Sequence, residues 1–150
     1  MDGTVLFVCH ANLCRSPMAE YLARDLLAGS AISVTSAGTH AQPGRPAHPH
    51  AVRILGERGL DPTSFRSRPL SRIDLTAAGL VLTASRRERA ACVALSPAAL
   101  GRVFTLRQFA RLATAALGAV PPTLPRHADP GPLGSAVTAA LRARALVQSV

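Results

Sequence analysis

Two reactive side chains, Cys9 and Arg15, enclose a segment of five residues near the start of the chain. A cysteine thiolate is a strong nucleophile, and the planar guanidinium of an arginine binds two oxygens of a phosphate group at once. A thiol and a guanidinium at the two ends of one short segment therefore predict a phosphate-binding loop that carries its own nucleophile.

The flanking residues are those that must position this segment. Residues 5–8 are all apolar and end directly at Cys9, which is typical of a buried strand. Ser16 is a good N-cap and Pro17 a good first helical residue, so a helix is predicted to begin there. Residues 9–15 then form a tight loop between a strand and a helix N-terminus. At such a place, backbone N–H groups and the helix dipole favour a bound anion.

The loop residues have distinct predicted roles in phosphoryl transfer. Cys9 would attack phosphorus to form a covalent thiophosphate, and Arg15 would hold two oxygens of the transferring group. Ser16 would donate a hydrogen bond to the Cys9 sulfur, and Asn12 suits a left-handed backbone position. For Cys14 two roles stay open: a small apolar filler, or a second thiol that forms a reversible disulfide with Cys9 on oxidation. The predicted phosphate-binding residues are His10, Ala11, Asn12, Leu13, Cys14 and Arg15.

Length and charge narrow the class of protein. A chain of 150 residues with 48% apolar residues is long enough for one domain with a buried core. The net charge of +9 comes from arginines without any lysine, which are scattered apart from one cluster at Arg86, Arg87 and Arg89. The aromatic residues are one tyrosine and four phenylalanines. Nucleic-acid binding needs clustered charge and stacking side chains, so we expect no nucleic-acid partner. The positive charge would still attract anionic substrates.

The sequence also indicates the subcellular compartment in which the protein works. No apolar stretch approaches the roughly 20 residues of a membrane span, and the N-terminus lacks the regions of a secretory signal. Three cysteines, an odd number, do not form a disulfide framework, and a reactive thiolate suits a reducing compartment. We therefore expect a cytoplasmic enzyme without a membrane partner.

Strand and helix patterns alternate along the chain. The pattern predicts strands at 5–8, 32–36, 79–83 and 103–106, and helices at 17–27, 50–58, from about 85, at 108–116 and at 133–147. Such alternation predicts an α/β fold with a parallel sheet, as a single domain over residues 1–150. Ligands of these sheets bind beyond the carboxyl ends of strands, which is where Cys9 lies.

The segment from Val8 to Pro17 closely resembles the signature of the low-molecular-weight protein tyrosine phosphatase family. The likeness continues in residues 18–20, 36–39, 44–46 and 66–70, and covers most of residues 4–135. It implies a flavodoxin-like, four-stranded parallel sheet with helices on both faces. It also implies a cysteine-dependent phosphomonoesterase without metal or other cofactor, acting on a phosphorylated protein or a small phosphomonoester. Within the loop, it implies that Ser36 hydrogen-bonds Asn12 as a brace.

The resemblance further implies a general acid, an aspartate from an Asp-Pro pair in a late loop, which protonates the leaving oxygen. The chain has two such pairs, Asp61-Pro62 and Asp129-Pro130. Asp61 lies where a turn is expected, whereas Asp129 lies in a Pro-rich passage just before the last predicted helix. We therefore assign the general acid to Asp129.

The chain departs from the family pattern around its loop. Ala11 stands where glycine is usual, which reduces backbone freedom. Gly131 and Pro132 stand where tyrosine phosphatases of the family often carry aromatic residues, and Leu13 remains as an apolar wall. The pattern thus predicts the reaction more firmly than selectivity for an aromatic ring.

Two alternatives share the same loop. An arsenate reductase of this fold needs a further pair of thiols to relay a disulfide. Cys92 falls near one such place, but Ser85 stands where its partner is expected. The other alternative is a catalytically silent module that only binds phosphate or phosphoproteins.

Overall fold

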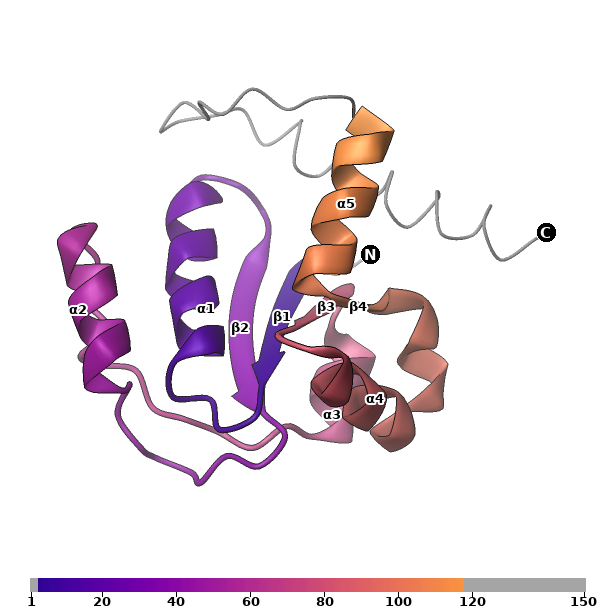
Figure 1. The fold of residues 1–150 in the computed structure, drawn as a ribbon, viewed down its shortest axis with the longest axis horizontal. Helices are drawn as coiled ribbons and strands as arrows, with labels where there is room; N and C mark the ends of the chain where they lie inside the picture. The colour runs from indigo at the N-terminus through magenta and orange to yellow at the C-terminus, as the bar shows by residue number, and fades with distance from the viewer. Residues whose placement is uncertain (1–2, 118–150) are drawn as a thin grey trace.

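The computed structural model describes residues 3–117, in which helices and strands alternate (Figure 1). The strands are β1 (Thr4–Cys9), β2 (Ser33–Gly38), β3 (Leu80–Thr83) and β4 (Val103–Thr105). The helices are α1 (Arg15–Leu26), α2 (Pro49–Glu57), α3 (Arg72–Ala77), α4 (Arg86–Leu95) and α5 (Leu106–Leu117), with a 3-10 helix η1 (Pro97–Arg102). The four strands pair in parallel in the order β2-β1-β3-β4, which confirms the predicted α/β fold.

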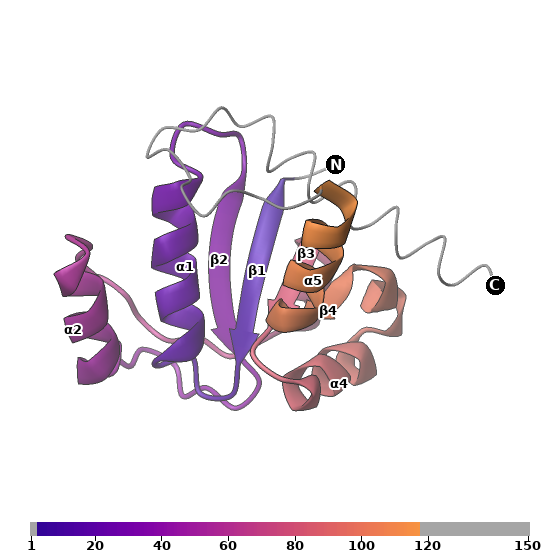
Figure 2. The same cartoon turned by 45° about the horizontal axis from the view of Figure 1, so that its top comes forward.

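Helices cover both faces of the sheet, because alternate strand residues point to opposite sides. One face packs Phe7 and Leu82 against Ala19 of α1 and Phe109 of α5. The other face packs Leu6 and Val81 together with residues of α3 and α4. Helix α2 contacts α1 and lies outside it, at the end of the molecule away from α4 (Figure 2).

The carboxyl ends of β1 and β2 meet at one edge of the sheet, where the loop from Cys9 to α1 also lies (Figures 1 and 2). Gly38 ends β2 and presses against this loop. A Cβ atom at Gly38 would lie 2.7 Å from the His10 carbonyl oxygen and 2.8 Å from the Asn12 nitrogen. Only a glycine permits this approach, which brings the second strand into contact with the loop.

The sequence pattern missed two elements, α3 and η1. Helix α3 has a capping box between Ser71 and Asp74, so its Ser-x-x-Asp spacing was a readable signal. The predicted helix at 133–147 and the Pro-rich passage lie outside the described residues. Across the described part of the chain, no helix is both long enough and apolar enough to cross a membrane.

Candidate active site

Cys9 is the last residue of β1, and its side chain is buried at the start of the loop. Its Sγ accepts a hydrogen bond from the backbone N–H of Asn12 at 3.3 Å and lies 3.0 Å from Ser16 Oγ. Donors aimed at a sulfur atom stabilise negative charge on it. The loop therefore surrounds Cys9 with the groups that a thiolate requires.

Ser16 does not cap the helix, contrary to the prediction. Helix α1 begins at Arg15, two residues before the predicted first helical residue Pro17, and Cys14 occupies the N-cap position without a side-chain capping bond. The Ser16 hydroxyl is engaged elsewhere, because its oxygen accepts a hydrogen bond from Asn12 Nδ2 at 2.8 Å. That contact leaves the hydroxyl proton free to donate to Cys9 Sγ, the role that the sequence predicted for Ser16.

Asn12 is completely buried and holds the loop from inside. Its φ of 54° confirms the predicted left-handed position, and it is the one non-glycine residue with positive φ among residues 3–117. Ala11 therefore needs no left-handed backbone, so its methyl group imposes no strain of that kind. Asn12 Nδ2 also donates to Ser36 Oγ at 2.9 Å, the contact that the family resemblance implies.

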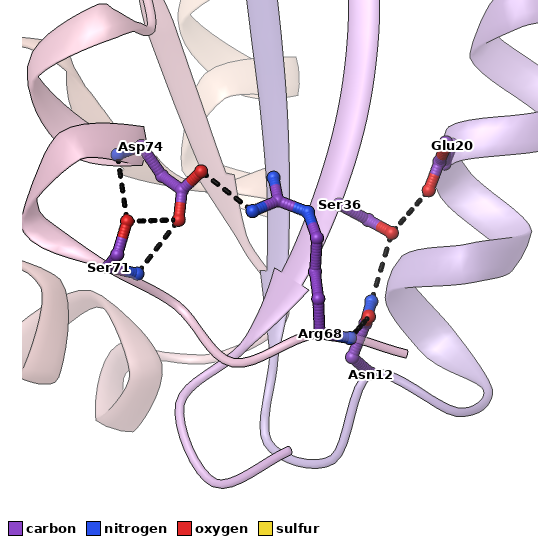
Figure 3. A network of polar contacts seen from close by, with 6 residues as sticks. All are labelled: Asn12, Glu20, Ser36, Arg68, Ser71 and Asp74. Carbon is purple, nitrogen blue, oxygen red and sulfur yellow. Dashed lines mark hydrogen bonds and ion pairs between the residues drawn. The ribbon is translucent and has the colours of Figure 1, made fainter. Parts of the chain in front are cut away.

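A chain of polar contacts continues from Asn12 in two directions (Figure 3). On one side, Ser36 donates to Glu20, a buried carboxylate of α1 that pairs with Arg24. On the other side, the backbone N–H of Arg68 donates to Asn12 Oδ1 at 2.9 Å. Sequence reasoning missed Glu20 and Arg68 as supports of the loop, although both lie in segments that carry the resemblance.

The Arg68 side chain extends the network to α3. Its Nη1 lies 2.7 Å from Asp74 Oδ1, and Asp74 also accepts hydrogen bonds from the backbone and hydroxyl of Ser71. Burial alone would raise the pKa of Asp74, but the hydrogen bonds from Ser71 and Arg68 outweigh it and lower that pKa. Asp74 therefore stays ionised and anchors Arg68.

Arg15, the predicted phosphate-binding cation, lies at the N-terminus of α1 with its side chain 55% exposed. A cation is unfavourable at this end of a helix unless an anion is near. Glu88 supplies one: its Oε1 lies 3.9 Å from Arg15 Nη2 although its side chain is only 5% exposed. Burial would raise the pKa of Glu88, but hydrogen bonds from Ser85 and its own backbone, with the charges of Arg15 and His10, lower it. Sequence reasoning missed Glu88, although Ser85 and Glu88 have the spacing of a capping box at the start of α4.

The other cysteines differ in their surroundings. Cys14 is half-buried, whereas Cys92 is a residue of α4 whose side chain is fully buried in the core. Burial, reinforced by the charge of Glu88, raises the pKa of Cys92 to about 11. Ser85, where a relay partner was expected, instead caps α4 and donates to Glu88. A buried, protonated thiol without a partner cysteine is poorly suited to the disulfide relay of an arsenate reductase.

Two imidazole rings lie beside the loop. His10 and His40 are both exposed and stack with their ring centroids 4.5 Å apart. The backbone supports this pair, because the N–H of His40 donates to the His10 carbonyl at 2.8 Å. Leu13 is half-buried in the same loop, and its carbonyl accepts a hydrogen bond from His48 at 2.7 Å.

The predicted general acid, Asp129, lies outside the described residues. The other Asp-Pro aspartate, Asp61, accepts a hydrogen bond from the Thr63 backbone in an exposed turn, as the sequence suggested. Among the described residues, no three His, Cys, Asp or Glu side chains are grouped so that they could hold a metal ion. Within the described residues, one braced loop carries the Cys9 thiol, the backbone N–H of Asn12 that donates to it, and the Arg15 guanidinium at its end.

Comparison with known proteins agrees with this geometry. The sequence model of the low molecular weight phosphotyrosine protein phosphatase family matches residues 4–125. The chain belongs to this family. Its fold and its Cys9 loop are those of the family, whose mechanism rests on a cysteine nucleophile in this position.

The relatives of this phosphatase are named for two different substrates, phosphotyrosine and phosphoarginine residues of proteins. A probable low molecular weight protein-tyrosine-phosphatase, EpsP of Ralstonia solanacearum, is 39% identical over 106 residues, which cover 71% of this chain and 72% of that protein. A protein-arginine-phosphatase of Geobacillus stearothermophilus is 38% identical over 110 residues, or 73% and 72% of the two chains. The solved structure of the YwlE arginine phosphatase from the same organism superposes with a TM-score of 0.64 at 29% identity, covering 97% of this chain and 94% of that one.

Proposed function

We propose that this phosphatase hydrolyses phosphate monoesters on proteins through a covalent intermediate on Cys9. The observation that carries the proposal is the pair of contacts at Cys9 Sγ, from the Asn12 backbone at 3.3 Å and Ser16 Oγ at 3.0 Å. Both stabilise negative charge on the sulfur. The sulfur carries that charge before it attacks phosphorus and again when it leaves.

The proposed reaction has two displacements at phosphorus. In the first, the Cys9 thiolate attacks, the S–P bond forms and the P–O bond to the leaving group breaks, while Asp129 gives its proton to the leaving oxygen. In the second, water attacks phosphorus and gives a proton to the Asp129 carboxylate, and the S–P bond breaks to release phosphate and the thiolate. Arg15 binds two nonbridging oxygens in both steps.

We propose phosphotyrosine as the substrate group, rather than phosphoarginine. A phenyl ring needs an apolar or flat surface beside the loop, which Leu13 and the stacked pair of His10 and His40 provide. A phosphorylated guanidino group needs an acidic partner instead. Among residues 3–117, the acidic side chain that contacts Arg15 is Glu88, which is buried and already hydrogen-bonded to Ser85, so it is not free to serve.

Steady-state hydrolysis of three probes tests this proposal: para-nitrophenyl phosphate, a phosphotyrosine peptide and the matching phosphoarginine peptide. We expect the wild type to turn over the two aryl esters and to act more slowly on the phosphoarginine peptide. Cys9→Ser should abolish turnover, because a hydroxyl cannot replace the thiolate. Negligible rates in the wild type would leave only a phosphate-binding module, and faster turnover of phosphoarginine would overturn the substrate assignment.

The role of Asp129 has its own test. Asp129→Ala should slow aryl phosphates with poor leaving groups more than those with good ones, because only the former need a proton on the leaving oxygen. Equal slowing of both kinds would show that Asp129 is not the general acid.

We infer a cytoplasmic location, which the chemistry of Cys9 supports. The three cysteines, Cys9, Cys14 and Cys92, are all free thiols in the structure, and a reducing compartment keeps a nucleophilic thiol in that form. Fractionation of cells that produce the protein, followed by immunodetection, tests this inference. Recovery in an oxidising compartment would contradict it.

A further inference from the structure

A cavity of about 660 Å³ lies beside the catalytic loop, over the carboxyl ends of β3 and β4. Its walls come from the starts of α4 and α5. Three arginines, Arg86, Arg107 and Arg111, line it. Within residues 3–117, the other lining residues are Ala84, Ser85, Thr105 and Ala110. The walls that the described residues contribute are therefore strongly positive.

The charges of these arginines are not balanced by the described part of the chain. All three side chains belong to exposed residues, and none forms an ion pair or a hydrogen bond with another residue in the range 3–117. Glu88 of α4 does not neutralise them, because its carboxylate is held by Ser85 and Arg15. An anion in the cavity would find three guanidinium groups that residues 3–117 leave unpaired.

The positions of the arginines are unfavourable without such an anion. Arg86 is the first residue of α4 and Arg107 the second of α5, where the helix dipole disfavours a cation. Arg107 and Arg111 are four residues apart on α5, so their like charges repel on one face. A bound carboxylate or phosphate would offset both effects, as the Glu88 carboxylate does at Arg15.

The cavity lies within reach of a substrate bound at Cys9. Its wall residue Ala84 donates a backbone hydrogen bond at 2.8 Å to Val8, the residue before the nucleophile. Adjacent strands are about 4.8 Å apart, so two strand spacings place the end of β4 roughly 10 Å from the end of β1. An extended peptide covers that distance in about three residues, at roughly 3.3 Å per residue.

We propose that this arginine cavity binds a second anionic group of the substrate, a carboxylate or phosphate two or three residues from the phosphorylated residue. The cavity thereby selects acidic or multiply phosphorylated segments of proteins. This inference rests on the proposed phosphatase function, since it places the phosphorylated residue over Cys9. It adds a specificity site that takes no part in the chemical steps.

The test compares kcat/KM for four probes: para-nitrophenyl phosphate, a phosphotyrosine peptide with neutral flanks, and two versions of that peptide. One version carries glutamates three residues to either side, and the other carries phosphoserines at the same places. We expect the wild type to prefer the acidic versions by about fivefold or more, from several exposed charge pairs. The preference should shrink as NaCl is raised.

The triple variant Arg86→Gln, Arg107→Gln, Arg111→Gln should lose this preference and still hydrolyse the small ester. Arg58→Gln is the matched control, because Arg58 is an exposed arginine at the end of α2, far from the cavity in the fold. The control should keep the wild-type preference. A wild type without preference, or a triple variant that keeps it, would overturn the proposal. A response to phosphoserine alone would restrict the site to phosphate.

A failure of the phosphatase function itself would be visible separately, as absent hydrolysis of para-nitrophenyl phosphate by the wild type. In that case, fluorescence anisotropy measures the Kd values of the labelled peptides for two proteins: Cys9→Ser alone, and Cys9→Ser combined with the triple arginine variant. The ratio of the Kd values for neutral and acidic peptides then reports the same preference. Equal Kd values for neutral and acidic peptides would then contradict the inference. Circular dichroism of the triple variant verifies that it is folded.

Discussion

The Asn12 side chain accepts a hydrogen bond at 2.9 Å from the backbone N–H of Arg68, a residue 56 positions further along the chain. The Arg68 carbonyl in turn accepts a bond at 3.0 Å from the N–H of Gly38, at the end of β2. One peptide segment thus bridges the catalytic loop and the neighbouring strand. Contacts with this distant segment, as well as the residues of the loop itself, therefore hold the loop in its conformation.

The first prediction concerns the side chain of Asn12. Asn12→Gly keeps the positive φ without strain but removes the bonds to Ser16, Ser36 and Arg68. We expect kcat for an aryl phosphate to fall by about 10- to 100-fold, as for other residues that orient a site. The kcat of Asn12→Ala should fall further, because the left-handed backbone also costs an alanine roughly 1–2 kcal/mol. Wild-type kcat in the glycine variant would show that the network does not position the loop.

The second prediction is a pH dependence of stability that arises from Asp74. Its pKa lies below the ordinary value of 3.8, so its ionised form stabilises the fold above that pH and loses this effect as pH falls through the folded pKa. Asp74→Asn should therefore lower the free energy of unfolding at pH 7 by about 1 kcal/mol, through the lost cap and ion pair. The difference from wild type should shrink below about pH 4.

Urea unfolding at several pH values measures this difference. The control is Asp25→Asn, since Asp25 is exposed and makes no ion pair within residues 3–117. It should leave the stability nearly unchanged at every pH. A difference between Asp74→Asn and wild type that stays constant down to pH 3 would rule out the proposed role of the ionised carboxylate.

Local signals in the sequence were sufficient for much of the fold and for the centre of the site. The apolar run that ends at Cys9, the spacing to Arg15 and the left-handed preference of Asn12 are all properties of adjacent residues. The parallel α/β sheet followed from the alternation of strands and helices and from the family likeness, whereas the strand order β2-β1-β3-β4 came from the structure. Helix α3 was missed although Ser71 and Asp74 have capping-box spacing, because its six residues are too few for a clear apolar period.

Contacts between distant segments were beyond a single sequence. Serine is a favoured N-cap residue, but the hydroxyl of Ser16 contacts Cys9 and Asn12 instead of capping the helix. The helix begins at Arg15. Glu88 lies 73 positions after Arg15, and only the parallel pairing of β1 with β3 brings α4 to the loop. Neither effect leaves a local pattern.

The third prediction is that Cys92 is chemically inert in the native protein. Burial, with the charge of Glu88, raises its pKa to about 11, so it is a thiol at pH 8. Iodoacetamide at that pH should modify Cys9, with protection by inorganic phosphate, and leave Cys92 unmodified until denaturant is added. Peptide mass spectrometry locates the adducts. Modification of Cys92 in the native protein would contradict its burial and protonation.

The fourth prediction compares two glycines with opposite roles. At Gly38 an added Cβ would lie 2.7 Å from the His10 oxygen, 2.8 Å from the Asn12 nitrogen and 2.9 Å from the Ala41 Cβ. Two of these atoms are backbone, so the clash can be relieved only if the loop moves. Gly38→Ala should therefore lower both kcat and the free energy of unfolding, the latter by about 1–3 kcal/mol.

Gly56 is the matched control, because it lies within α2 and an added Cβ there meets no atom within 4 Å. Gly56→Ala should raise the free energy of unfolding by about 0.5–1 kcal/mol, since alanine loses less backbone entropy in a helix, and should leave kcat unchanged. Thermal unfolding and aryl phosphate hydrolysis measure both variants side by side. If Gly38→Ala were as stable and active as Gly56→Ala, the close approach of β2 would not be what holds the loop around Cys9.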